Sequence, residues 1–132
     1  MASTESKSPV RVVVVDDHQL FADALHLFLS RDGRIDVIGV ASSGQEAIDL
    51  ALAGAADVVL MDVFMRGMDG LEATKRLRSI RPETHVIVLT GLEGEEIGVE
   101  AREAGAEGYL KKGAVHERLV DAVLRVAAGQ SL

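Results

Sequence analysis

The sequence has no cysteine, few basic residues and no hydrophobic run of membrane length. Without cysteine the chain forms neither disulfides nor thiolate metal sites, which agrees with a reducing compartment such as the cytoplasm. Its 14 Lys and Arg residues are outnumbered by 21 Asp and Glu residues, so the formal net charge is −7. This balance leaves no basic face to neutralise phosphates, and we expect no direct contact between this segment and nucleic acid. The lack of a long apolar run predicts no membrane span.

The residues that are present suit one folded domain. At 132 residues, of which 48% are hydrophobic, the chain is long enough to bury a core. Residues 1–9 are mostly small and polar with no apolar stretch, so we interpret them as a disordered tail and not as a signal peptide. The domain itself is predicted over residues 10–128.

Short β-branched stretches alternate with helical patterns along this domain. Strands are predicted over residues 11–15, 35–40, 57–61, 85–89 and 107–110. A helical segment follows each strand, which gives five βα units. Alternating βα units predict a parallel sheet with helices on both faces. We therefore expect an α/β, flavodoxin-like, doubly wound fold with five helices and the strand order 2-1-3-4-5.

Local signals set several helix ends and one helix face. Ser43, three residues before Glu46, predicts a capping box at the start of the second helix, and Gly54 should end that helix. Pro82 should stop the third helix. For the first helix, expected from about residue 18 to residue 30, the inward face is predicted to consist of Leu20, Ala24, Leu27 and Phe28.

Three aspartates stand where two predicted strands end. Asp16 and Asp17 follow the apolar run 12–15, and Asp62 follows the run 58–61. In the flavodoxin-like order these two strands are neighbours, and their carboxyl ends open onto the ligand crevice, so the three carboxylates should converge. Mg²⁺ is held by one or two carboxylates together with waters and phosphate oxygens. An aspartate can also accept a phosphoryl group itself.

The fourth and fifth strands add further polar groups to the same edge. Thr90 follows the fourth strand, and Lys111 and Lys112 follow the fifth. In phosphoryl transfer a protein mainly positions the reacting groups and stabilises charge on the equatorial oxygens, which Mg²⁺ and a cationic side chain do together. The sequence therefore predicts a phosphoryl-accepting site at this edge.

The motifs VVVVDD, LMD followed by MRGMDG, VLTG and GYLKKG together resemble the receiver domain of two-component response regulators. The opening VVDDHQLF and the ending AVLRVAAGQSL resemble the NarL/FixJ type, in which a helix-turn-helix DNA-binding domain usually follows. Residues 129–132 would then begin the interdomain linker. The resemblance implies a sensor histidine kinase as partner, Mg²⁺ as cofactor and a cytoplasmic location, and it admits a homodimer.

By position, the resemblance implies that Asp62 is the phosphoryl acceptor. Mg²⁺ would be held by Asp16, Asp17, Asp62 and the backbone carbonyl of Phe64. The chain would catalyse its own phosphorylation and dephosphorylation, acting as a switch and not as a turnover enzyme.

The resemblance also implies a route from the site to an output face. Thr90 would meet the phosphoryl oxygens, Lys112 would be the active-site lysine, and Tyr109 would change rotamer together with Thr90. The responding face would comprise the helix within residues 91–104, the strand over 107–110 and the last helix. That face would control a transcriptional output domain outside this chain.

Two residues depart from the family pattern. Lys111 stands where the family has an apolar residue, and Arg66 stands where the usual loop has proline, which loses a fixed φ and would make the loop more mobile. A stand-alone receiver that acts by protein contact is an alternative. A Mg²⁺-dependent phosphohydrolase with an aspartyl nucleophile is a weaker one, because that class needs a second acid at the position occupied by Phe64.

Overall fold

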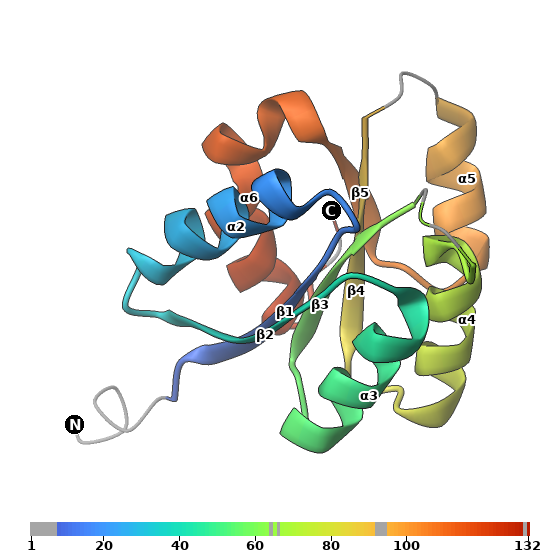
Figure 1. The fold of residues 1–132 in the computed structure, drawn as a ribbon, viewed down its shortest axis with the longest axis horizontal. Coiled ribbons are helices and arrows are strands. Elements are labelled where there is room, and N and C mark those ends of the chain that lie inside the picture. The colour runs from blue at the N-terminus through green and yellow to red at the C-terminus, as the bar shows by residue number, and fades with distance from the viewer. Residues whose placement is uncertain (1–7, 64, 66, 92–94, 131) are drawn as a thin grey trace.

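The computed structural model describes residues 8–63, 65, 67–91, 95–130 and 132. It contains one sheet of five strands (Figure 1), which are β1 (Val10–Val15), β2 (Ile35–Ala41), β3 (Val58–Asp62), β4 (His85–Thr90) and β5 (Gly108–Lys111). Their order is β2-β1-β3-β4-β5, and each pair of neighbours is parallel. The predicted fold class and strand order are therefore confirmed.

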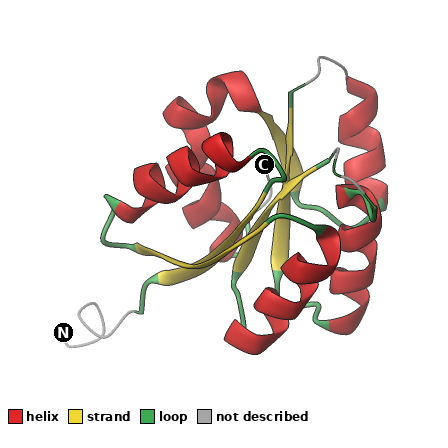
Figure 2. Cartoon of the chain, viewed as in Figure 1, coloured by secondary structure: helices red, strands yellow, loops and turns green. Residues whose placement is uncertain are grey.

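Helices cover both faces of this sheet. They are α2 (Gln19–Ser30), α3 (Gly44–Gly54), α4 (Gly70–Ile80), α5 (Glu95–Glu103) and α6 (Val115–Ala127), with a short 3₁₀ turn, η1 (Lys112–Ala114), before α6. Helices α2 and α6 lie on one face, and α3, α4 and α5 lie on the other (Figure 2). Within the described part of the chain, no helix is long and apolar enough to span a membrane.

The sheet separates two apolar layers, and β1 contributes to both. Val12 and Val14 belong to the layer beneath α2 and α6, whereas Val13 and Val15 belong to the layer beneath α3, α4 and α5. All four valines are fully buried. A central parallel strand is covered on both faces, which explains why this run contains no polar residue.

The capping box at the start of α3 forms, but one of its two hydrogen bonds involves Ser42 instead of Ser43. The Ser43 hydroxyl accepts a hydrogen bond from the Glu46 N–H at 3.1 Å. The Glu46 carboxylate reaches back to the Ser42 N–H, at 2.9 Å, and so satisfies the donor one residue earlier than the motif predicts.

Two helix ends agree with the sequence signals to within one residue. Helix α3 includes Gly54 as its last residue, and Ala55 after it adopts the left-handed conformation with a φ of 50°. A Cβ atom on Gly54 would lie 2.5 Å from the Ile38 Cδ1, so this glycine also allows α3 to pack closely on β2. Helix α4 ends at Ile80, before Pro82, as predicted.

The predicted inward face of α2 is right for Phe28 and wrong for its other three residues. Leu20 and Leu27 are 76% and 69% exposed, and Ala24 is exposed as well. Helix α2 has apolar side chains on more than one side, and the 3.6-residue period does not say which side meets the sheet. The residues that pack on the sheet are the buried Ala22, Leu25 and Leu29, with Phe21 and Phe28 partly buried beside them.

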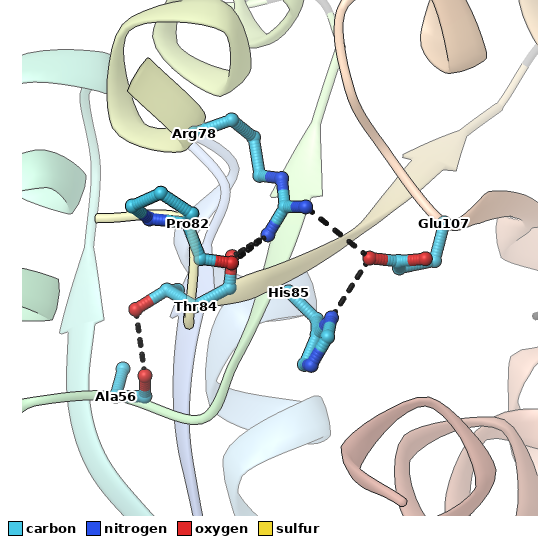
Figure 3. Close-up of polar contacts among 6 residues, drawn as sticks. All are labelled: Ala56, Arg78, Pro82, Thr84, His85 and Glu107. Atoms are coloured by element: carbon cyan, nitrogen blue, oxygen red, sulfur yellow. Dashed lines mark hydrogen bonds and ion pairs between the residues drawn. The ribbon is translucent and has the colours of Figure 1, made fainter. Parts of the chain in front are cut away.

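A polar network fastens α4 to the amino-terminal end of the sheet (Figure 3). Arg78 donates hydrogen bonds through Nη1 to the carbonyl oxygens of Pro82, at 2.6 Å, and of Thr84. Its Nη2 atom lies 3.7 Å from the Glu107 carboxylate, which also lies 2.8 Å from the His85 Nδ1. The network joins α4, β4 and the residue before β5 at the end of the sheet away from Asp62.

The Thr84 side chain makes a second set of contacts beside this network, and replacing it tests them. Thr84 is fully buried, and its hydroxyl donates to the Ala56 carbonyl at 2.7 Å and accepts from the Arg81 Nε at 2.9 Å. Thr84→Val keeps the shape but leaves a buried carbonyl without its donor, so the free energy of unfolding should fall by about 1–2 kcal/mol in urea denaturation. Arg81→Met removes only the accepted bond and should cost clearly less. Equal stability of Thr84→Val and the wild type would contradict this role.

Candidate functional site

The carboxyl ends of the strands gather the polar residues that the sequence singles out. Asp62 ends β3 and Thr90 ends β4, whereas Asp16 directly follows β1 and Lys112 directly follows β5. Asp62, Thr90 and Asp16 are buried, and Asp17 is exposed at the rim. The strand order thus brings residues from four strand ends to one place.

The three carboxylates form one cluster with a cation beside it. One oxygen from each of Asp16, Asp17 and Asp62 can be chosen so that all three lie within 4.8 Å of one another. The Lys112 Nζ lies 2.7 Å from the Asp16 Oδ2 and 3.2 Å from the Asp62 Oδ1. The lysine therefore bridges the ends of β1 and β3 from its position after β5.

Asp16 uses its two carboxylate oxygens differently. Its Oδ1 accepts a hydrogen bond from the His18 N–H at 2.8 Å, which fixes the turn into α2. Its Oδ2 is the one buried side-chain oxygen or nitrogen, among the described residues, that has no hydrogen bond of good geometry. It pairs instead with the Lys112 ammonium, whose Nζ lies 2.7 Å away. The Asp16 carboxylate is thus held by one backbone N–H and one ammonium, and a cluster of carboxylates suits a hard metal ion.

The cluster perturbs the acid–base properties of its members. Burial, and next the negative charge of Asp16, raise the pKa of Asp62 from 3.8 to about 6, although the Lys112 ammonium opposes both effects. Burial alone would lower the pKa of Lys112, but its contacts with Asp16 and Asp62 outweigh burial and raise that pKa. Its surroundings therefore destabilise the ionised form of Asp62, and a nearby positive charge stabilises that form.

Backbone packing fixes the position of Asp62. Gly70, the first residue of α4, lies so close to Asp62 that a Cβ atom on it would be 1.9 Å from the Asp62 carbonyl oxygen. The Gly70 N–H donates to the Val63 carbonyl at 2.8 Å. The Asp69 carboxylate caps α4 by accepting from the Glu72 N–H at 2.8 Å. Only glycine fits at position 70.

An aromatic side chain contacts the lysine, and sequence reasoning missed it. The Lys112 Nζ lies 4.7 Å from the centroid of the Phe21 ring, in the first turn of α2. No spacing in the sequence indicates this contact, because Lys112 follows β5, far from Phe21 along the chain. The predicted α2 face omitted Phe21.

The sequence matches a known protein family over most of its length. The profile of the response regulator receiver domain matches residues 12–124, which is most of the chain. The chain belongs to the response regulator receiver family. The resemblance drawn from the sequence motifs is therefore confirmed.

Individual relatives support the same assignment for this receiver domain. Response regulator GacA of Pseudomonas aeruginosa is 40% identical over 121 residues, which cover 92% of this chain and 56% of GacA. Transcriptional regulatory protein LiaR of Bacillus subtilis is 38% identical over 121 residues, which cover 92% of this chain and 57% of LiaR. The chain thus spans just over half the length of these relatives.

A solved structure agrees in detail with the fold. The signal receiver domain of the response regulator NarL from Mycobacterium tuberculosis has a TM-score of 0.89 and 37% identity, covering 94% of this chain and 100% of that one. Together with GacA and LiaR, it confirms the NarL/FixJ type.

The receiver's predicted switch aromatic has an unexpected neighbour. Tyr109 lies on β5 and is partly buried, with its ring against α5 at Gly98. A Cβ atom on Gly98 would lie 2.7 Å from the Tyr109 Cε1, so the ring rests against the helix backbone. Phe64, expected as a metal ligand through its carbonyl, and Arg66 lie outside the described residues.

The raised pKa of Asp62 predicts a pH-dependent gain in stability for Asp62→Asn. The folded state holds the Asp62 proton more tightly than the unfolded state does. The contribution of this proton to the free energy of unfolding is therefore complete below about pH 4 and is lost as the pH rises through about 6. Asparagine does not ionise, so the variant does not lose this contribution. Without Mg²⁺, we expect a gain of about 1–3 kcal/mol in the free energy of unfolding near pH 7, and a smaller gain near pH 4.

Urea denaturation at both pH values measures this difference. Asp36→Asn is the matched control, because Asp36 is an exposed carboxylate on β2. It should change stability by less than about 0.5 kcal/mol at either pH. A gain for Asp62→Asn that is independent of pH would show that burial does not govern this carboxylate.

Proposed function

We propose that this receiver domain is a phosphorylation-activated switch in which Asp62 accepts the phosphoryl group. The observation that carries the proposal is a buried carboxylate at the end of β3, set among two further carboxylates and 3.2 Å from the Lys112 ammonium. Such a site combines a nucleophile with groups that stabilise negative charge on transferring oxygens.

Mg²⁺ is the cofactor that the carboxylates fit best. Asp16, Asp17 and Asp62 offer hard oxygen ligands within 4.8 Å of one another, and their three carboxylates face a single ammonium, that of Lys112. The Phe64 carbonyl is the fourth protein ligand in this proposal, on the strength of the family resemblance. When bound, Mg²⁺ supplies positive charge that offsets the repulsion among the carboxylates and the phosphoryl oxygens.

The proposed phosphoryl step transfers the group from a sensor histidine kinase to Asp62. A carboxylate oxygen of Asp62 attacks phosphorus, while the bond from phosphorus to the donor nitrogen of a sensor histidine kinase breaks and that nitrogen keeps the electron pair. In this proposal Lys112 and Thr90 hold the phosphoryl oxygens. Water later attacks the phosphorus of the acyl phosphate, and this step releases inorganic phosphate and restores the Asp62 carboxylate.

The output proposed for this switch is control of transcription. Thr90 and Tyr109 would respond to the phosphoryl group, and the face formed by α5, β5 and α6 would change with them. Residues 129–132 would begin a linker to a DNA-binding domain. This part of the proposal is supported by the name of LiaR, a transcriptional regulatory protein, and by the greater length of the relatives. A homodimer and a cytoplasmic location belong to the same proposal.

Phosphorylation by a small acyl phosphate tests the acceptor. In the presence of Mg²⁺, intact-mass measurement should show one added phosphoryl group on the wild type and none on Asp62→Asn, because an amide is a poor nucleophile. Removal of Mg²⁺ by a chelator should also suppress the modification. The control is Asp36→Asn, which removes an exposed carboxylate distant from the cluster. This variant should be modified like the wild type. Modification of Asp62→Asn at the wild-type rate would place the acceptor elsewhere.

Amide hydrogen exchange tests the response of the output face. Phosphorylation of the wild type should alter exchange in α5 and β5. Thr90→Ala and Lys112→Ala should still accept some phosphoryl group, but their exchange in these elements should change little. Equal phosphorylation-dependent changes in the wild type and both variants would refute the proposed roles of Thr90 and Lys112.

A further inference from the structure

We propose that Phe21 is a positioning residue for Lys112, because the face of its ring holds the ammonium beside Asp62. The ring centroid lies 4.7 Å from the Lys112 Nζ, within the distance of about 6 Å over which an aromatic face attracts a cation. This inference rests on the proposed function, since it assigns a support to the lysine of that site.

The backbone explains why Phe21 is at this place. The Asp16 carboxylate accepts from the His18 N–H at 2.8 Å, and the His18 carbonyl accepts from the Phe21 N–H at 3.1 Å. The turn that orients Asp16 therefore also sets the first turn of α2. One short stretch of backbone thus places both a carboxylate and an aromatic partner of Lys112.

Of the three partners of Lys112, two can also bind a metal ion and one cannot. Asp16 and Asp62, at 2.7 Å and 3.2 Å from the Nζ, are proposed Mg²⁺ ligands, so a bound cation would weaken their attraction for the ammonium. The Phe21 ring has no ligand atom for Mg²⁺, and its attraction for the lysine does not depend on those carboxylates. The ring is the partner that remains when the metal binds.

The surroundings keep the ring in place. Phe21 is partly buried and packs against the apolar layer beneath α2 and α6. The Lys112 side chain is only 23% exposed, so the contact is partly shielded from water, where a cation–π interaction is stronger than on an open surface. Phe28, on the same helix, is also partly buried against this layer. Within the described residues its ring has no cation contact, which makes it a matched control.

Nuclear magnetic resonance tests the contact directly. Protons over an aromatic face are shifted upfield, so the Lys112 side-chain methylene protons next to Nζ should show this shift, assigned by its loss in Lys112→Ala. We expect the shift in the wild type, Phe21→Tyr and Phe28→Leu, with and without saturating Mg²⁺, and its loss in Phe21→Leu. Absence of the shift from the wild type, or its disappearance when Mg²⁺ binds, would overturn the proposal.

Phosphorylation rates with the acyl phosphate test the consequence. Phe21→Leu should slow phosphorylation about threefold to tenfold, whereas Phe21→Tyr should restore the wild-type rate and Phe28→Leu should leave it unchanged. In a Lys112→Ala background, Phe21→Leu should have no further effect, because its partner is gone. The same slowing in both backgrounds would mean that Phe21 acts only through packing. If the wild type accepts no phosphoryl group, the proposed function fails, and the resonance measurement still decides whether Phe21 holds Lys112.

Discussion

The position of one ammonium group, that of Lys112, is the constraint on which this site depends. Three carboxylates lie close together at the edge of the sheet, and burial raises the pKa of Asp62 to about 6. Lys112 offsets part of this repulsion and links the ends of β1, β3 and β5 through two short charge contacts. The site is therefore held together by opposite charges and yet has an excess of negative charge. A bound cation would offset the remaining negative charge, which is why the proposed Mg²⁺ site lies here.

Backbone contacts fix the positions of the charged side chains, which charge attraction alone does not do. Gly70 packs directly on the Asp62 carbonyl, and Asp16 is tied to the turn that starts α2. The network around Arg78 and Thr84 fastens α4 and β4 at the opposite end of the sheet. These contacts hold Asp62, the proposed nucleophile, on rigid elements, which is how proteins keep reacting groups in productive geometry.

The fold and the cluster could be predicted from sequence because both depend on local patterns. Apolar runs such as 12–15 contain no polar residue when both faces of a strand are covered, and the acids that end them mark the open edge. The inward face of α2 could not be predicted, because its apolar residues form more than one stripe. The contact of Phe21 with Lys112 depends on packing between distant segments, and no spacing in the sequence specifies it.

The glycine at position 98 has a geometric consequence for any movement of α5. The Tyr109 ring lies against the helix backbone, with no α5 side chain between them. If the ring turned away, α5 would have no side chain at that point to fill the space left behind, and an unfilled space loses packing contacts. An approach of the helix itself towards β5 would close that space. The absence of a side chain at Gly98 would thus couple a rotation of the Tyr109 ring to the position of α5.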